Sequence, residues 1–405
     1  MKPKVIFVSI NFFSPEFLDG ANKVTYNLLK ESDLYSASFL SLYSGKLEPI
    51  EEKLFSHVPT ASLNAQVSSL RKYSRVFSWI KGNSLASMAK ADAIKLARHI
   101  EECAESYDVI YLTSLSLASC MQYFSQQVLC KVILGAVDSY SMYCERRVEN
   151  EKKIFKKWLY RRELKLAQNF EKCFYSLSPK TVFVSSVDED YSRENMPGGS
   201  YLNIPLGVDT DYFRPAPENI KIKPNQIIFT GNLSYAPNRD ACRFLVFELL
   251  PILKIEIPDI KVVLAGANPT AEILSLSDPS ILVTGQVADL RPFIWESALF
   301  VCPLRFGSGM KNKVLEILSM EKAALFSSVA LEGIENIEGL VSIEPDQLKG
   351  KLLKEIKSQL LQANIMKESE RSFRRAIKEH YSWSLRRNSY FELFSEVTLS
   401  LRKTR

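Results

Sequence analysis

The sequence contains little of what metal sites and disulfide scaffolds need. Only 3 histidines occur in 405 residues, and none of them neighbours a group of cysteines. The 7 cysteines are odd in number and form no CxxC pair, and several sit inside apolar segments, where thiols behave as small hydrophobic side chains. We therefore expect a reduced, cytoplasmic protein without a zinc site.

Long apolar runs are also missing. None approaches the roughly 18 consecutive residues that would cross a bilayer. The N-terminus, MKPKVIFVSINFF, superficially resembles a signal peptide, but Ser9 and Asn11 break its apolar run and no small-residue cleavage site follows, so we expect a first strand there. The net charge of +6 is too small to indicate nucleic-acid binding; it suits a protein that meets phosphates, although an ordinary basic surface explains it more simply.

What the sequence does contain is a regular alternation of short β-branched runs with longer amphipathic stretches. At 405 residues the chain fits two domains of ordinary size. Near-continuous apolar runs separated by helical periods indicate an α/β protein with parallel sheets covered on both faces. The expected strands are 4–10, 108–112, 131–137 and 181–186 in a first series, and 226–231, 260–266, 281–285, 298–303 and 323–328 in a second.

The two series are separated by a segment, 203–226, that holds four prolines and little helical pattern, and we take it as the linker. Two doubly wound domains would place the carboxyl ends of their strands, and so their binding crevices, across a cleft from each other. Several expected strands end in small or polar residues. Such residues also simply turn a chain, but so many at the same end favour a binding site.

One loop collects basic residues where a helix normally avoids them. In PLRFGSGMKNKVLEIL (303–318) a glycine-containing loop leads into a segment with helical apolar spacing. The N–H groups at a helix start already carry partial positive charge, so Lys311 and Lys313 in the first turn are locally unfavourable. A diphosphate bound there would reverse this penalty, because it would meet the N–H groups, both ammonium groups and the guanidinium of Arg305.

Two further features of this loop fit a nucleotide. Gly307 and Gly309 would let the backbone approach a ligand closely. Glu316 lies one turn beyond Lys313, where its carboxylate would accept hydrogen bonds from a ribose diol. The alternative is a solvated helix face with a Lys313–Glu316 pair. The added glycines and Arg305 favour the nucleotide diphosphate pocket.

Together with FTGNLSYAPN, LAGAN, VTGQVADL and IPLGVDTDYF, this loop resembles the retaining family-four glycosyltransferases of the GT-B fold, the glycosyl transferases of group 1. The resemblance is strong over about 180 to 385 and weaker, though consistent in order, over the N-terminal half. It implies two facing Rossmann-like domains with a cleft between them. These are an acceptor-binding domain over 1–205 and a nucleotide-sugar-binding domain over 206–380, followed by a C-terminal helix over 381–405 that packs back toward the first domain.

The resemblance also implies roles for individual residues. It places the reaction at Arg305, Lys313 and Glu316, without a metal, because basic residues neutralise the leaving diphosphate; Asp138 is a fourth candidate because of its place at the end of a strand. No cofactor is permanently bound, and the donor substrate is a UDP- or GDP-type nucleotide-sugar. The residues expected to contact the donor are Gly20, Gly231, Asn232, Asn238, Gly266, Val287, Gly307, Ser308, Gly309, Met310, Lys311 and Val314.

The sequence departs from the common pattern of the family in two places. Ser308 stands where relatives often carry the first of two glutamates eight positions apart. Asn232 and Pro237 stand where relatives often carry an arginine and a lysine. We expect the basic residues of the 303–318 loop to replace those missing charges, and backbone N–H groups of 307–310 to contact the sugar.

The N-terminal half offers two candidate positions. Gly20 lies between the first strand and an amphipathic helix, where it either belongs to a loop near the donor or merely turns the chain. Asp138 ends the 131–137 strand, where it either orients substrate hydroxyls or caps the next helix. A retaining enzyme needs no carboxylate base, because the departing phosphate takes the acceptor proton.

Two basic stretches in this half, 151–173 and 70–82, combine Lys and Arg with Trp, Phe and Ile. Such stretches suit contact with an anionic membrane, which would fit a lipid-linked acceptor and a site on the inner face of the plasma membrane. The alternative is that both are surface helices whose apolar sides lie in the core.

We therefore expect a glycosyltransferase that moves a hexose-type sugar to a hydroxyl acceptor, and the family resemblance implies a role in bacterial polysaccharide or glycolipid assembly. Two other classes remain open: a sugar-nucleotide epimerase or phosphorylase of the same fold, and a non-catalytic partner subunit. Nucleic acid is not an expected partner.

Overall fold

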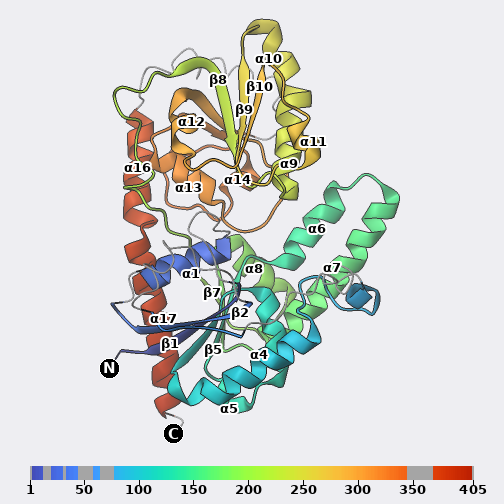
Figure 1. Ribbon diagram of the computed structural model, residues 1–405, viewed down its shortest axis with the longest axis vertical. Coiled ribbons are helices and arrows are strands. Elements are labelled where there is room, and N and C mark those ends of the chain that lie inside the picture. The colour runs from blue at the N-terminus through green and yellow to red at the C-terminus, as the bar shows by residue number, and fades with distance from the viewer. Residues whose placement is uncertain are drawn as a thin grey trace. The chain divides into compact units, whose positions relative to one another are not determined.

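The computed structural model describes residues 2–11, 20–30, 33–43, 58–63, 77–343 and 368–403. The chain divides into two compact units. Unit 1 contains Met1–Leu206 and Ser384–Arg405, and unit 2 contains Gly207–Trp383. Each unit has a parallel sheet with helices packed on it, so the predicted α/β class is confirmed (Figure 1).

Unit 1 is built on a seven-stranded parallel sheet with the order β3-β2-β1-β4-β5-β6-β7. Its strands are β1 (Lys4–Asn11), β2 (Ser36–Tyr43), β3 (Thr60–Ser62), β4 (Val109–Leu112), β5 (Val132–Val137), β6 (Lys180–Phe183) and β7 (Tyr201–Asn203). The apolar runs predicted β1, β4, β5 and β6. The patterns missed β2, whose buried face includes serines, and the three-residue strands β3 and β7.

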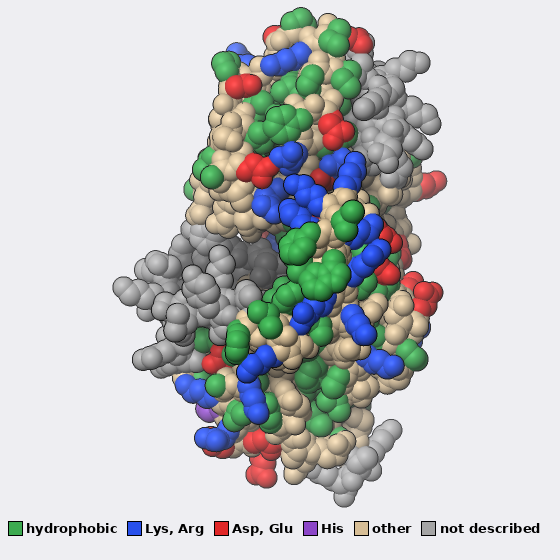
Figure 2. Space-filling view, turned by 90° about the vertical axis from the view of Figure 1, so that its right-hand side faces the viewer, with side chains coloured by type: hydrophobic (Ala, Val, Ile, Leu, Met, Phe, Trp, Pro, Cys, Tyr) green, Lys and Arg blue, Asp and Glu red, His purple; other side chains and the backbone are tan. Residues whose placement is uncertain are grey.

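The helices of unit 1 include a pair, α6 and α7, that runs side by side on one flank (Figure 1); the face of the molecule on that flank is drawn in Figure 2. The longer elements are α1 (Gly20–Lys30), α4 (Lys90–Cys103), η3 (Leu115–Tyr123), α6 (Tyr140–Asn150), α7 (Ile154–Tyr175), α8 (Ser186–Asn195) and α17 (Trp383–Lys403), and the short ones are η2 (Ala104–Ser106) and α5 (Gln126–Leu129). Within the described residues, no helix combines the length and the apolar character that crossing a membrane requires.

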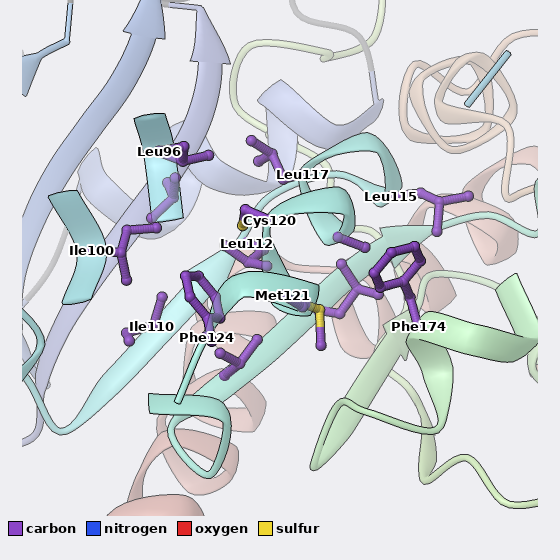
Figure 3. Close-up of a cluster of buried hydrophobic side chains, with 14 of the residues drawn as sticks. Leu96, Ile100, Ile110, Leu112, Leu115, Leu117, Cys120, Met121, Phe124 and Phe174 are labelled. Carbon is purple, nitrogen blue, oxygen red and sulfur yellow. The ribbon is translucent and has the colours of Figure 1, made fainter. Parts of the chain in front are cut away.

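The core of unit 1 lies between the sheet and α4, η3 and α7. Ile110 and Leu112 of β4 are completely buried against Leu96 and Ile100 of α4, and Phe174 of α7 closes the same cluster (Figure 3). The chain between β4 and β5 stays in 3₁₀ geometry over η3, and this element buries Leu117, Cys120 and Met121 in the core.

The C-terminal helix α17 is held on the unit 1 sheet by aromatic rings. The ring of Phe394 lies 5.9 Å from Phe7, 5.2 Å from Tyr35 and 6.0 Å from Tyr111, in edge-to-face arrangements that aromatic pairs prefer. Tyr390, one turn earlier, meets the ring of Tyr111 at 5.8 Å. Burial raises the pKa of Tyr390 to about 12, as expected for a phenol withdrawn from water.

Unit 2 has a five-stranded parallel sheet with the order β10-β9-β8-β11-β12. All five strands were predicted: β8 (Lys223–Thr230), β9 (Lys261–Ala265), β10 (Ile281–Gly285), β11 (Ser297–Cys302) and β12 (Ala324–Phe326). The helical segments are α9 (Ala236–Arg243), η4 (Phe244–Leu249), α10 (Leu250–Glu256), α11 (Ala271–Leu274), α12 (Arg291–Glu296), α13 (Asn312–Ser319), α14 (Ser328–Leu331) and α16 (Glu368–His380).

We predict that Phe394→Ala destabilises unit 1 by about 3 to 5 kcal/mol, because it removes a fully buried ring that packs against four others. Hydrogen–deuterium exchange of the β1 and β4 peptides under mild denaturant measures the change within this unit. Leu399→Ala is the matched control, since Leu399 lies on the same helix but is exposed. Equal exchange in the two variants would show that the aromatic cluster does not hold the helix.

Candidate functional site

The order of the unit 2 strands has a topological switch point between β8 and β11. From β8 the chain moves outward through β9 and β10, then returns so that β11 pairs with the other side of β8. The loops that follow β8 and β11 therefore run in opposite directions from the carboxyl ends of two adjacent strands. In doubly wound sheets such a switch point is the usual place for a ligand.

An ammonium group lies at this switch point. Nζ of Lys313, from α13, donates a hydrogen bond of 2.8 Å to Oδ1 of Asn238 on α9 and lies 4.1 Å from the ring centre of Phe229 in β8. Burial lowers the pKa of Lys313 below that of an ordinary lysine. This half-buried cation has one amide oxygen and one aromatic face as its described contacts, with the Glu316 carboxylate near enough to act on its charge, and it would gain from a bound anion.

Glycines make this approach possible. Gly231, directly after β8, has φ +154°, and a Cβ built on it would lie 2.9 Å from Nζ of Lys313 and 2.7 Å from Nδ2 of Asn238. A Cβ on Gly266, after β9, would lie 1.9 Å from the carbonyl oxygen of Gly231. Both positions therefore exclude a side chain, and the loops after β8 and β9 pack backbone against backbone.

Hydrogen bonds hold these loops in register. The N–H of Gly231 donates to the carbonyl of Ala265 at 3.0 Å, and the N–H of Leu233 donates to that of Ala267 at 2.8 Å. The N–H of Gly266 donates to Oγ1 of Thr284 at 3.3 Å, which adds the end of β10. The loops after β8 and β9 and the end of β10 are thus joined by hydrogen bonds, and Gly231 in this group lies beside Lys313.

The loop after β11 approaches the same point. Gly307 has φ +147° and Gly309 has φ +69°, a backbone region that favours glycine. Helix α13 begins at Asn312, and its cap residue, Lys311, makes no side-chain capping bond. Oδ1 of Asn312 is buried and has no hydrogen-bond partner among the described residues. The first N–H groups of α13 therefore have no side-chain cap, and they are the groups that an anion at this helix start would meet.

Two of the basic residues differ from the sequence expectation of free cations. The guanidinium of Arg305 is held by both oxygens of Asp240, at 2.7 and 2.6 Å, and reaches Glu248 at 3.3 Å, because a planar guanidinium matches a carboxylate in shape. These bonds raise its pKa further. Nζ of Lys311 donates to the carbonyl of Gly309 at 2.7 Å and lies 3.5 Å from Glu332. Both cations brace the loop.

Of the remaining predicted residues of unit 2, two lie near Lys313 and Asn238, and one lies in the core. Glu316 lies on α13 close enough to Lys313 to oppose the fall in the pKa of that lysine, and Asn232 accepts a bond at its carbonyl from Nδ2 of Asn238 at 2.9 Å. Val314 is fully buried and its N–H donates to Lys311, so its side chain belongs to the core and not to the site.

For three further predicted positions the structure gives only their place and burial. Ser308 and Met310 are buried in the loop after β11, and Val287 is half-buried beyond the end of β10. The sequence reasoning missed Arg239, on α9 beside Asn238. Its Nε is buried with no hydrogen-bond partner within the described residues. The sequence could have indicated Arg239 as a site residue, because it is a basic residue in the first turn of a helix, as Lys313 is.

Unit 1 carries a second candidate position at the end of β5. Val137 has φ +70°, and the N–H of Asp138 donates to the carbonyl of Ala136 at 2.9 Å, which closes a tight γ-turn. Positive φ is strained for a β-branched residue and often marks a functional position. The cap of α6 is Ser139, whose side chain accepts from the N–H of Met142, so Asp138 does not have the capping role.

Two buried carboxylates hold this turn in place. Oδ1 of Asp188 accepts from the N–H of Ser139 at 2.7 Å, and Oε1 of Glu171 accepts from the N–H of Tyr140 at 2.7 Å and from the hydroxyl of Tyr175 at 3.0 Å. Burial raises the pKa of Glu171 from 4.5 to about 7, although these hydrogen bonds oppose the shift. Hydrogen bonds to these two carboxylates thus stabilise the backbone that follows the strained turn.

Gly20 is the first residue of α1, and residues 12–19 before it lie outside the described part of the chain. Where the structure describes the chain, no three His, Cys, Asp or Glu side chains are grouped in a way that would hold a metal ion.

Comparison with protein families matches part of the sequence of unit 2. Residues 224–360, which include Gly231, Asn238, Lys313 and Glu316, match the family described as glycosyl transferases group 1. A search of curated proteins finds no match to the chain.

Solved structures similar to the chain span its whole length. Sucrose-phosphate synthase from Thermosynechococcus elongatus is 14% identical with a TM-score of 0.69, over 98% of this chain and 100% of that one. Anabaena HepE in complex with UDP and glucose is 12% identical with a TM-score of 0.66, over 97% and 99%. A Staphylococcus aureus TarM variant with UDP is 10% identical with a TM-score of 0.68, over 97% and 100%. The predicted GT-B fold is confirmed.

We predict that unit 1 becomes less stable as the pH rises from 4.5 to about 7. Folded Glu171 keeps its proton to a higher pH than the same residue does in the unfolded chain, so the proton favours the folded state only at low pH. The loss is at most about 3 kcal/mol. Glu171→Gln keeps an acceptor but does not titrate, so the difference in urea midpoint between the two proteins should shift across this range. Parallel pH curves for wild type and variant would contradict the prediction.

Proposed function

We propose that this chain, which has the GT-B fold and matches the glycosyl transferases of group 1 over residues 224–360, transfers a sugar from a nucleoside diphosphate sugar to a hydroxyl group. One observation carries the proposal. The ammonium of Lys313 lies at the switch point of the unit 2 sheet, against Gly231, which in turn packs on Gly266.

The donor diphosphate is placed between the ends of β8 and β11. There Lys313 supplies positive charge, the first N–H groups of α13 supply hydrogen bonds, and Gly231 and Gly307 allow phosphate oxygens to approach the backbone. A bound diphosphate would raise the lowered pKa of Lys313, because an opposite charge favours the ammonium. We assign charge neutralisation to Lys313 and Arg239, and bracing of the loop to Arg305 and Lys311.

The nucleoside and sugar are assigned to neighbouring groups. Glu316, one turn into α13, accepts hydrogen bonds from the ribose diol, as the family resemblance implies. The backbone around Val287 is assigned to the base. Ser308 and the N–H groups of 307–310 are assigned to the transferred sugar, in place of the glutamate that relatives often carry. UDP is the favoured nucleotide, because the HepE and TarM structures contain UDP.

The reaction exchanges two bonds at the anomeric carbon of the sugar. The bond to the diphosphate oxygen breaks with its electron pair, and a bond to the acceptor oxygen forms. In the retaining course that we propose, the leaving phosphate accepts the acceptor proton, and Lys313 stabilises the charge that develops on it. Unit 1 is assigned the acceptor, with Asp138 on its supported turn as a hydrogen-bond acceptor for a hydroxyl. In this arrangement the protein's own cations take the place of a metal.

The experiment that tests this proposal is calorimetric binding of UDP, GDP and ADP, followed by release of UDP from UDP-sugars with simple sugar acceptors. We expect UDP to bind and its release to require an acceptor. UDP release that is accompanied by no new glycosidic bond would favour an epimerase-type enzyme, and failure to bind any nucleotide would favour a non-catalytic subunit. The anomeric configuration of the product decides whether transfer retains it.

Lys313→Ala should lower kcat by on the order of a hundredfold, the usual scale for losing a group that stabilises transition-state charge. The effect on the affinity for UDP should be smaller, since the N–H groups of α13 remain. Lys261→Ala removes an exposed lysine of the same unit and is the matched control. An unchanged kcat in the Lys313 variant, with normal UDP binding, would remove this residue from the reaction.

Arg305→Ala and Asp240→Ala should have similar and non-additive effects on kcat/KM, because each breaks the same pair. A double-mutant cycle with steady-state kinetics measures the coupling. If instead Arg305 contacts phosphate directly, its loss should cost far more than the loss of Asp240, and the two effects should add.

A further inference from the structure

Helix α7 begins with large apolar side chains that face water. Ile154 is 88% exposed, Phe155 72% and Trp158 56%. Two more, Phe77 at 59% and Ile80 at 57%, lie on the nearby segment 77–83. We call these five residues the apolar patch. Exposed apolar side chains are ordinary when scattered, but a contiguous group usually marks a contact surface.

The two segments that carry the apolar patch are fastened together. Nη2 of Arg162 donates to the carbonyl oxygens of Trp79 at 3.1 Å and Ile80 at 2.8 Å, and its guanidinium lies 4.4 Å from the Trp79 ring. The rings of Phe155 and Trp158 stack, with centres 6.4 Å apart. The apolar patch is therefore an ordered surface of unit 1. Residues 70–76, the first part of the basic stretch 70–82, lie outside the described residues.

The apolar patch is not the core face of its helix. Further along α7, Glu163, Ala167 and Phe174 are buried, whereas the first turns point their apolar side chains outward. The sequence-based alternative, that the apolar side of this stretch lies in the core, therefore holds for the C-terminal half of α7 but is wrong for Ile154 and Trp158.

Positive charge surrounds the apolar patch. Residues 152–162 contain six Lys and Arg and no Asp or Glu. On the other segment, Nζ of Lys81 lies 4.7 Å from the centre of the Phe77 ring. Figure 2 shows hydrophobic side chains gathered on this face with Lys and Arg along their border.

We propose that the apolar patch and its basic border bind the surface of an anionic lipid bilayer. Aromatic rings and Ile would enter the boundary between headgroups and acyl chains, while long Lys and Arg side chains extend to the phosphates. Two other occupants fit less well. A second copy would bring two like-charged borders together across a two-fold axis, and a nucleic acid would leave the aliphatic side chains unburied. The proposal does not depend on the transfer activity, because it needs no nucleotide.

Flotation with lipid vesicles tests this inference on the full chain. We expect binding to vesicles with about two thirds phosphatidylcholine and one third phosphatidylglycerol, and little binding to phosphatidylcholine alone. Binding should weaken between about 0.05 and 0.5 M NaCl, because salt screens the basic border. Equal binding to both kinds of vesicle, or none to either, would overturn the proposal.

Variants separate the apolar from the charged contribution. Phe155→Ser with Trp158→Ser, and separately Lys152→Gln with Lys156→Gln, should each weaken vesicle binding at least about tenfold, since buried apolar groups and surface cations contribute on this scale. All four residues are exposed, so the fold should persist, and thermal unfolding checks this.

The matched controls are Phe247→Ser with Ile255→Ser, and Lys221→Gln with Lys261→Gln, which make the same changes at exposed positions of unit 2. They should bind vesicles as the wild type does. If the Phe155 and Trp158 variant binds vesicles normally, or if it abolishes a concentration-dependent dimer while the wild type ignores vesicles, the apolar patch is not a membrane surface.

Discussion

The ammonium of Lys313 lies against the end of β8 because residues 231 and 266 have no side chains. A Cβ on Gly231 would enter the space that Lys313 and Asn238 occupy, and one on Gly266 would strike the carbonyl oxygen of Gly231. The arrangement of the loops at this switch point follows from it. The β8 and β9 loops can meet backbone to backbone, Thr284 of β10 accepts from the Gly266 N–H, and α13 can bring a lysine to a place that burial makes unfavourable for it.

Two of the basic residues of the loop after β11, Arg305 and Lys311, are engaged with carboxylates, and that difference gives Lys313 its significance. Arg305 is matched by two carboxylates and Lys311 by a carbonyl and a carboxylate. Lys313 has an amide oxygen and an aromatic face as described partners. The turn at Asp138 shows a comparable arrangement in unit 1, where Glu171 and Asp188 stabilise a strained backbone at the end of a strand. In both places surrounding polar groups maintain a local conformation that would be unfavourable alone.

Local patterns predicted a large part of the fold. Every strand with a continuous apolar run was found, including all of unit 2, because burial on both faces leaves a clear signal in the sequence. The strands β3 and β7 are too short for any pattern, and β2 alternates serine with apolar residues. The sequence also identified Gly231 and Lys313 as candidate site residues in two different segments. It gave no reason to expect that Glu171 and Asp188 accept hydrogen bonds from the backbone that follows Asp138. Those contacts join residues 31 and 49 positions apart.

The sequence by itself determined the strands of unit 2, the positions of the glycines and the concentration of positive charge in residues 152–162 and 303–318, since each depends on neighbouring residues. Only the tertiary structure decided which cations have partners. Arg305, Lys311 and Lys313 read alike along the chain, yet Asp240 and Glu332, from other elements, hold the first two. It also decided that Ile154 and Trp158 face water and Val314 does not. Periodicity shows that a helix has an apolar side, but which parts of that side are covered depends on the elements that pack against it.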